Sequence, residues 1–325
     1  MKTTHYFKQL ALVVTISCFA FSCNNDDDGY SAPEEPQSTT ITALASESND
    51  LSILVSALQA AGLDSTLDSE GSFTVFAPTN AAFENFLADN NFSGLSDIPV
   101  DVLTQVLLNH VIAGEVFSTS LTTSYGNTLA TQNGSGENLS IYIDTSNGVT
   151  LNGVSNVSVA DVDASNGVIH IVDAVIGLPT IATFATTNSA LSILVDALAY
   201  ADTGNPTVPY IDTVSNPTAG PFTVFAPTND AFVDLLGELE ISALTDLTPA
   251  QIDTVLLYHI VGANVQSSQL QTGVVSTLGG DITADATAFT LTDPNDRVSN
   301  IITALVDIQA ANGVVHVIDK VILNN

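Results

Sequence analysis

The sequence contains the octapeptide FTVFAPTN twice, at Phe73–Asn80 and at Phe222–Asn229. Other segments recur in the same order in both halves: LSILVSAL returns as LSILVDAL, LLNHVIAGEV as LLYHIVGANV, and NGVIHIVDAVI as NGVVHVIDKVI. The repeated unit of about 140 residues has a usual domain size and is far longer than a solenoid repeat of roughly 20–50 residues. The repetition therefore predicts two copies of one domain, at 43–179 and 180–325, each folded around its own hydrophobic core.

Each copy has helical patterns first and strand patterns afterwards. Leu51, Leu54 and Val55 recur at helical spacing, whereas the following FTVF stretch is β-branched and aromatic, as in a strand. A proline then interrupts the strand, and residues that cap helices follow it. These are Pro78, Thr79 and Asn80 in the first copy and Pro227, Thr228 and Asn229 in the second. The back half of each copy alternates polar and apolar residues around Asn-Gly pairs, which indicates hairpins and places both domains in the α+β class.

The N-terminus reads as an export signal. Lys2 and Lys8 precede an apolar run, Leu10–Ser22, that is shorter than the roughly 20 residues needed to span a bilayer. The run ends at Cys23, and the stretch before this residue resembles a bacterial lipobox, although Cys18 is an alternative inside the run. We therefore expect a lipoprotein signal peptide over 1–22, an acylated Cys23, and an acidic, proline-containing tether over 23–42. Such a protein is exported, sits on the outer membrane or cell surface, and contacts the membrane only through its lipid.

The charge excludes one class of partner. The chain has four Lys and Arg residues against 35 Asp and Glu residues. Cleavage before Cys23 would remove Lys2 and Lys8 and leave only Arg297 and Lys320. Because no basic patch can form to neutralise phosphates, we expect no nucleic-acid binding. The acidic surface suits salty surroundings and cationic partners.

The duplicated motifs resemble those of the fasciclin-like domain. FTVFAPTNAAF and FTVFAPTNDAF are similar to the first family motif, and the two NGV-x-H stretches are similar to the second. A Tyr-His pair that the family has between them is kept as Tyr258-His259 but is Asn109-His110 in the first copy. The resemblance implies two tandem fasciclin-like domains, each a wedge-shaped β-sandwich with helices packed on one side. It also implies adhesion or matrix contact outside the cell, without catalysis.

Four histidines remain after cleavage, at matching positions in the two copies: His110, His170, His259 and His316. They allow two interpretations, a metal site or general base on one side and a hydrogen-bonded core residue on the other. No cysteine or H-x-x-x-H spacing supplies further ligands, so we favour a structural role and expect neither metal nor cofactor. The stretch Asp293–Asp296 resembles a calcium loop only in composition, and a β-turn is the better interpretation.

One loop distinguishes the copies. The segment between the first helix and FTVF is much longer in the second copy, at 202–221, and it contains Pro206, Pro209, Tyr210 and Pro217. Prolines reduce the entropy of a free loop, so this segment is a candidate binding loop, although a tolerated insertion is the alternative.

These patterns contain no catalytic motif, and we expect no enzyme. The predicted function is a non-catalytic cell-surface module that binds an extracellular protein or polysaccharide, including a second copy of itself. A carbohydrate-binding lipoprotein of a polysaccharide uptake system is the alternative, but such a protein would need aromatic platforms, and the chain has no Trp.

Overall fold

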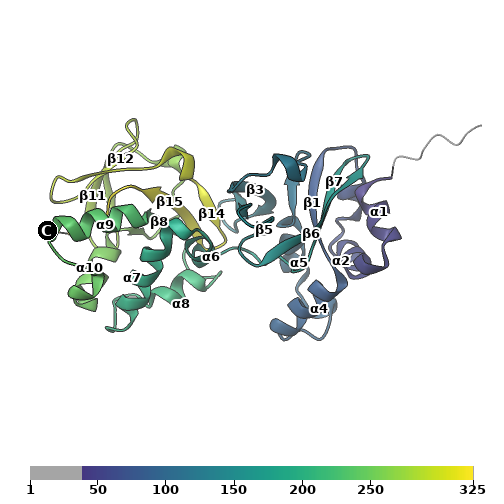
Figure 1. Ribbon diagram of the computed structural model, residues 1–325, viewed down its shortest axis with the longest axis horizontal. Coiled ribbons are helices and arrows are strands. Elements are labelled where there is room, and N and C mark those ends of the chain that lie inside the picture. The colour runs from purple at the N-terminus through teal and green to yellow at the C-terminus, as the bar shows by residue number, and fades with distance from the viewer. Residues whose placement is uncertain (1–38, 325) are drawn as a thin grey trace, which may run out of the picture. The chain divides into compact units, whose positions relative to one another are not determined.

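The structure, a computed structural model, describes residues 39–324, and all of them belong to one compact unit (Figure 1). The signal segment, Cys23 and most of the expected tether therefore lie outside the described residues. In each half of the unit one strand lies among the helices and the remaining strands follow them, so the α+β class and the tandem arrangement are confirmed. The sequence segments that repeat form equivalent elements in the two domains.

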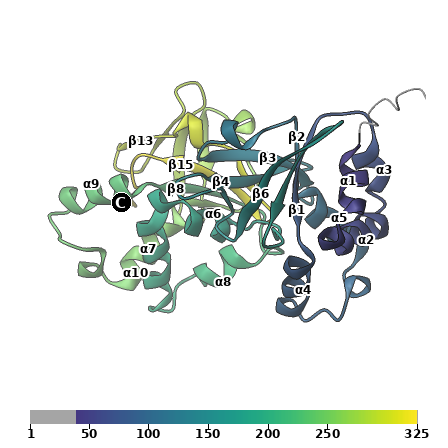
Figure 2. The same cartoon turned by 45° about the vertical axis from the view of Figure 1, so that its right-hand side comes forward.

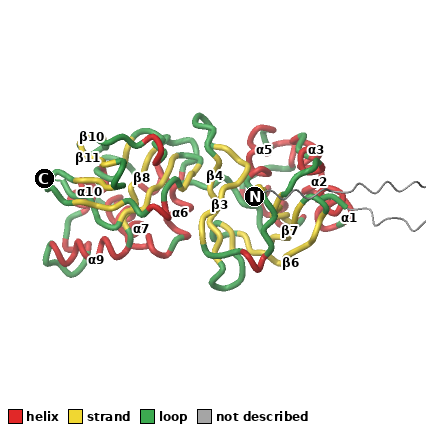
Figure 3. The backbone as a smooth tube through the Cα atoms, turned by 90° about the horizontal axis from the view of Figure 1, so that it is seen from above, coloured by secondary structure: helices red, strands yellow, loops and turns green. Residues whose placement is uncertain are grey.

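The first domain opens with helices that cover one side of its sheet. The helices are α1 (Ile41–Glu47), α2 (Ser52–Ala61), α3 (Asp64–Asp68), α4 (Asn80–Asp89) and α5 (Val100–Leu108). The strands are β1 (Phe73–Pro78), β2 (Val111–Ala113), β3 (Ser124–Thr131), β4 (Asn138–Asp144), β5 (Thr150–Leu151), β6 (Ser155–Ala164) and β7 (Gly167–Val172). Helices α1, α2 and α3 lie together on one flank, as Figures 2 and 3 show.

The strands of the first domain close into a barrel in the order β1 to β7, because β1 pairs in parallel with β7. The expected wedge-shaped sandwich is therefore a seven-stranded barrel here. One apolar cluster, around Phe83 and Leu107, lies between the helices and the sheet, and a second, around Phe76 and Leu151, lies on the other side of the strands.

The second domain repeats the helices as α6 (Ile181–Thr187), α7 (Ser192–Asp202), α8 (Tyr210–Ser215), α9 (Asn229–Glu238) and α10 (Pro249–Leu257). Its strands are β8 (Phe222–Pro227), β9 (Ile260–Val261), β10 (Gly273–Ser276), β11 (Asp281–Asp285), β12 (Thr290–Thr292), β13 (Val298–Asn300), β14 (Ile308–Ala310) and β15 (Gly313–Ile318). They form two sheets, in the orders β10-β11-β12-β13 and β14-β15-β8-β9.

The second domain does not close into one barrel because its strands are interrupted at two places, between β13 and β14 and between β9 and β10, whereas the equivalent β2 and β3 are paired. In the first domain β6 runs continuously from Ser155 to Ala164. In the second domain a 3-10 turn, Thr303–Leu305, separates β13 from β14, so these strands fall into different sheets. A bridge between Ile301 and Ile318 still holds the two sheets together.

The first domain starts two residues before its expected boundary. Helix α1 begins at Ile41, which is buried, and its backbone N–H donates to the side chain of Asn166 at 2.9 Å. The side chain of Thr40 caps the helix by accepting from the N–H of Ala43. Residues 41 and 42, which the sequence assigned to the tether, are therefore part of the folded domain.

Candidate functional site

The FTVFAPTN motif builds a junction between a strand and two helices. The Thr79 hydroxyl caps α4 by accepting from Ala82 N–H, and Thr228 caps α9 in the same way. The Asn80 side chain then reaches back to the start of α2, where its Oδ1 accepts from Ile53 N–H and its Nδ2 donates to the Asn49 carbonyl. Asn229 makes the equivalent bonds to Ile193 and Ser189. Every polar atom of the motif named here is therefore used within its own domain.

His110 and His259 occupy equivalent positions at the end of α5 and α10. The Nδ1–H of His110 donates to the Val106 carbonyl at 2.7 Å, and its Nε2 accepts from Ile176 N–H at 2.8 Å. His259 repeats this pattern with Val255 and Ile322. Burial lowers the pKa of both histidines to about 4, so both are neutral at pH 7.

His170 and His316 use the opposite tautomer. In each ring Nδ1 accepts a backbone N–H, from Asp161 and Asp307 respectively, at 3.2 Å. Nε2 carries the hydrogen and donates to the carbonyls of Val116 and Val265 at 2.9 Å. Burial lowers the pKa of His316. All four histidines thus have both ring nitrogens occupied by backbone groups, which leaves none of these atoms to accept a substrate proton or bind a metal.

Asn109 in the first domain and Tyr258 in the second occupy equivalent positions, and both side chains pack within their own domain. Asn109 is fully buried; its Nδ2 donates to the Gly177 carbonyl and its Oδ1 accepts from the Thr128 hydroxyl. Tyr258 packs closely against Gly279 and Gly280 in the second domain. The departure from the family pair in the first copy is therefore compensated by two buried hydrogen bonds.

The long loop at 202–221 is anchored by two carboxylates. Asp202 accepts from the backbone N–H groups of Tyr210 and Ile211, and Asp253 accepts from the Tyr210 hydroxyl at 2.8 Å. Tyr210 is fully buried, so it holds the loop from inside rather than offering a binding surface. Burial, with a smaller effect of the bond to Asp253, raises the pKa of Tyr210.

Two prolines of the loop do face outward. Pro209 and Pro217 are exposed, and Pro206 is half-buried. Pro206 and Pro209 border an open depression together with Asp202, Asn205 and Asp212. This loop therefore presents apolar rings beside carboxylates on a segment that internal hydrogen bonds hold in place.

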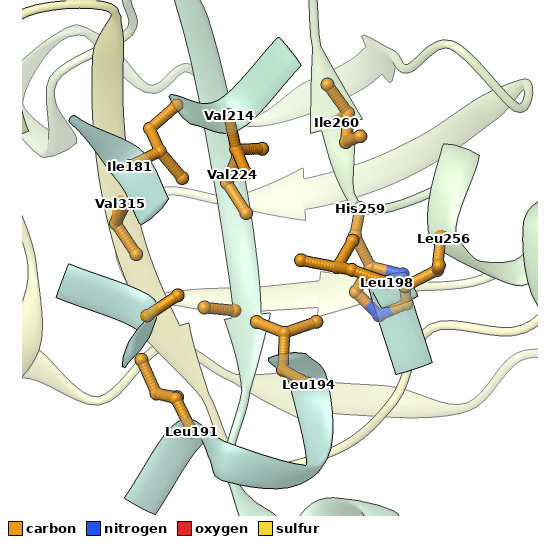
Figure 4. Close-up of a pocket in the computed structure, with 12 residues that line it drawn as sticks. Ile181, Leu191, Leu194, Leu198, Val214, Val224, Leu256, His259, Ile260 and Val315 are labelled. Atoms are coloured by element: carbon orange, nitrogen blue, oxygen red, sulfur yellow. The ribbon is translucent and has the colours of Figure 1, made fainter. Parts of the chain in front are cut away.

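An apolar cavity of about 20 Å³ lies in the core of the second domain, and Figure 4 shows its lining. Leu194, Leu198 and Leu256 surround the ring of His259 there, and the remaining lining is aliphatic. Because both nitrogens of His259 are bonded to backbone, the cavity has no group that could perform acid–base chemistry.

The Asp293–Asp296 stretch is a turn that holds the end of the described chain. The Asp293 carboxylate accepts from the backbone N–H groups of Asn295 and Leu323 and pairs with Arg297 at 3.0 Å. Arg297 also donates to the Val321 carbonyl. Within residues 39–324 no three His, Cys, Asp or Glu side chains are grouped so that they could hold a metal ion.

The part of the chain that the structure describes contains no single helix long and apolar enough to cross a bilayer. One pair, Ile181–Thr187 with Ser189–Asp202, passes the length and composition test only when taken together, and it is bent by 100°. Phe184, Leu194 and Leu198 of this pair are buried in the protein core.

The two domains meet at a joint between β3–β4 of the first domain and α6–β14 of the second (Figure 1). Tyr125 and Tyr142 are cross-strand partners, and the ring of Tyr125 meets that of Phe184 edge-on, with centroids 5.6 Å apart. The Asn188 amide donates to the Tyr125 hydroxyl at 3.2 Å. Burial raises the pKa of Tyr125 to about 12.

Backbone groups complete the joint. The N–H of Gln309 donates to the Ser140 hydroxyl at 2.9 Å, and the Gln132 amide donates to the Ala311 carbonyl at 3.2 Å. Tyr142, only 8% exposed, belongs to the apolar cluster of the second domain. Each domain has its own apolar clusters, and one cluster of the second domain also includes Tyr142 of the first. The sequence patterns did not identify this joint, because burial of these two tyrosines depends on contact with a segment more than 40 residues further along the chain.

These observations define a protein of two tandem α+β domains whose repeated polar residues bond within the fold. The family model of the fasciclin domain matches residues 49–179 and 190–324. The chain therefore belongs to the fasciclin-domain family.

Several relatives are similar to one or both domains. Protein sll1483 of Synechocystis sp. is 37% identical over 144 residues, which are 44% of this chain and 73% of that protein. Cell surface glycolipoprotein MPB83 of Mycobacterium bovis is 35% identical over 144 residues, 44% of this chain and 60% of the relative. Transforming growth factor-beta-induced protein ig-h3 of Sus scrofa is 28% identical over 262 residues, and this match covers 79% of the chain but only 35% of ig-h3. A solved FAS1 domain pair from the insect cell adhesion molecule Fasciclin I is 17% identical, with a TM-score of 0.46 over 83% of this chain and 94% of that one.

Proposed function

We propose that this protein is a non-catalytic cell-surface module that binds an extracellular protein or polysaccharide. The observation that carries the proposal is the use of the histidines: all eight ring nitrogens of the two domains bond to backbone groups. The four histidines, which are the residues best suited to acid–base catalysis, thus link segments of the backbone. We therefore expect a partner to bind to the exposed faces and loops. The family and the surface location in the name of MPB83 support the same function.

Anchoring is the first part of this proposal. Cys23, which lies outside the described residues, is proposed to carry the lipid, and the first described helix begins at Ile41 with Thr40 as its cap. A lipid on Cys23 would hold the domains outside the cell by a short acidic segment. Attraction of the protein surface to anionic lipids would not contribute, because the surface is acidic.

We expect Cys23→Ser to release the protein from the membrane fraction into the soluble fraction. The acyl chains are the only membrane contact in this proposal, so their loss should change the distribution almost completely. Cell fractionation with immunoblotting measures this, and Cys18→Ser is the matched control, which should stay membrane-bound. Retention of the Cys23→Ser protein, or release of the Cys18→Ser protein instead, would refute the anchor at Cys23.

The loop at 202–221 is the proposed contact surface for the partner. It presents Pro209 and Pro217 to solvent, and it is held by Asp202, which accepts from the Tyr210 N–H, and by Asp253, which accepts from the Tyr210 hydroxyl. A segment that is already ordered loses little entropy when it binds, which favours such loops as recognition surfaces. Its carboxylates favour a partner that is neutral or cationic.

Attachment and biofilm formation should fall in a deletion strain and return when the intact chain is restored. A restored chain with Pro209→Ser and Pro217→Ser should regain only a small part of the attachment. Val100→Ser, which alters an exposed residue of α5, should behave as the intact chain. Full attachment in the proline variant would exclude this loop, and turnover of a matrix polymer by the purified protein would refute the non-catalytic function.

A further inference from the structure

The outer face of the β10–β13 sheet is equivalent to the β3–β4 face of the first domain, which contacts the second domain at the joint. In the first domain, the cross-strand pair Tyr125 and Tyr142 forms the joint. The equivalent pair in the second domain is Val274 and Thr283, which the matching registers of β10 and β11 establish. The Asp144–Thr150 pair and the Asp285–Thr290 pair align the neighbouring strands in the same way. The same surface is thus an interface in one domain and open in the other.

The open face is partly apolar. Register pairs place Val274, Thr283, Thr292 and Val298 in one row across four strands. Val274 is 70% exposed and Val298 is 48% exposed, whereas Ile282, Ala284 and Leu291 fill the opposite, buried face. Exposed valines on a sheet face that is an interface in the sister domain indicate a docking surface.

The complementary surface also exists twice. On the second domain it consists of α6 and β14, with Phe184 and Gln309 at the joint. Ile41 and Ile181 bond to Asn166 and Asn312 in the same way, so Leu44 of α1 stands where Phe184 stands in α6. Asp163 of β6 likewise stands where Gln309 stands, because their register partners are Val168 and Val314. The first domain therefore has the matching edge, and within the described unit nothing covers it.

We propose that the α1–β6 edge of one copy docks on the β10–β13 face of a second copy, which repeats the internal joint between chains. The contact joins unlike surfaces, so each copy keeps one free face and one free edge, and the product is an open row of copies rather than a closed dimer. This assembly concerns copies of the protein alone and stands whether or not the proposed adhesion function does.

Repulsion between carboxylates should make this contact between copies depend on salt concentration. Where the internal joint has Ser140 and Thr187, the contact between copies has Asp281 of one copy and Glu47 of the other. Both carboxylates are exposed, and they bring negative charge from both copies to the interface. Their repulsion is screened when the Debye length falls from about 10 Å at 0.1 M salt to about 3 Å at 1 M salt. Association should therefore be weak at low salt and increase with ionic strength.

The test is the molar mass of the purified protein lacking residues 1–23, measured by sedimentation at about 0.02 M and about 1 M NaCl. The unmodified chain should be a monomer at low salt and exceed the mass of a dimer at high salt as concentration rises. Asp281→Ser should associate about tenfold more tightly at low salt, since it removes one of the charges at the contact and restores the serine that the internal joint has at this position. Val274→Asp should remain a monomer throughout, and Val233→Asp, which changes another exposed valine on α9, should behave as the unmodified chain.

Each outcome decides the proposal. A monomer under all conditions for both the unmodified chain and Asp281→Ser would overturn it. Association of Val274→Asp to the same extent as Val233→Asp would also overturn it, because the copies would then use another surface. Circular dichroism of each variant confirms that the fold is kept, since both valines are exposed and neither contributes to a core.

Discussion

The free energy of unfolding should fall steeply when the pH is lowered from 7 to 4.5, by about 2–3 kcal/mol for each of His110 and His259. Burial holds the folded pKa of both residues at about 4, against 6.5 for a free histidine. Between these values the unfolded chain binds a proton at each site and the folded chain does not. The stabilisation is therefore complete above pH 6.5, is lost as the pH falls toward 4, and changes little below that.

The geometry explains why these protons are excluded. A proton on Nε2 of His110 would face the N–H of Ile176 at 2.8 Å, so protonation would replace a hydrogen bond with two opposed donors. Urea unfolding at fixed ionic strength across this pH range measures the effect. The His110→Gln and His259→Gln double variant should be less stable at pH 7 but should show a much smaller loss on acidification. An equally steep loss in that variant would show that the histidines are not the cause.

Substitution of Gly167 or Gly313 by alanine should destabilise the protein by about 2–5 kcal/mol. Both glycines begin the strand that pairs in parallel with FTVF, and their φ angles are +149° and +154°. An added Cβ would lie 2.0 Å from the Phe73 carbonyl oxygen at Gly167 and 2.1 Å from the Phe222 carbonyl oxygen at Gly313. Those oxygens belong to backbone, so neither substitution can be relieved by a side-chain movement.

Gly237→Ala is the matched control for this prediction. Gly237 lies in α9, is exposed, and has no atom within 4 Å of an added Cβ. Alanine there should stabilise the protein by roughly 0.5 kcal/mol, because glycine is a poor helix former. Urea unfolding of the three variants measures the change in the free energy of unfolding, which should be negative for Gly167→Ala and Gly313→Ala and positive for Gly237→Ala. Gly167→Ala and Gly313→Ala proteins as stable as the unmodified chain would show that β1 and β8 can shift away from these glycines.

Local chemistry made the duplicated elements predictable. Thr79 and Thr228 cap helices because a hydroxyl beside a helix start binds free backbone N–H groups, whatever the rest of the fold. The apolar spacing around Leu54 and Leu103 likewise required helices with one buried face. The second motif, NGVIHIVDAVI, was predictable as a strand. The three hydrogen bonds of its Asn166 side chain, to Leu67, Ser69 and Ile41, were not predictable from the sequence. That role depends on three segments that only the folded chain brings together.

By itself the sequence determined that two α+β domains of the fasciclin family follow one another, because repeated motifs carry their own caps, turns and hydrophobic spacing. Only the tertiary structure decided what the non-repeated residues do. It buried Tyr210 beneath the proline loop, closed the first barrel but interrupted the second, and placed Tyr142 in the core of the neighbouring domain. It also left Val274 exposed where Tyr125 is covered. The physical reason is that helix caps and spacing act over a few residues, whereas burial depends on which distant segments meet.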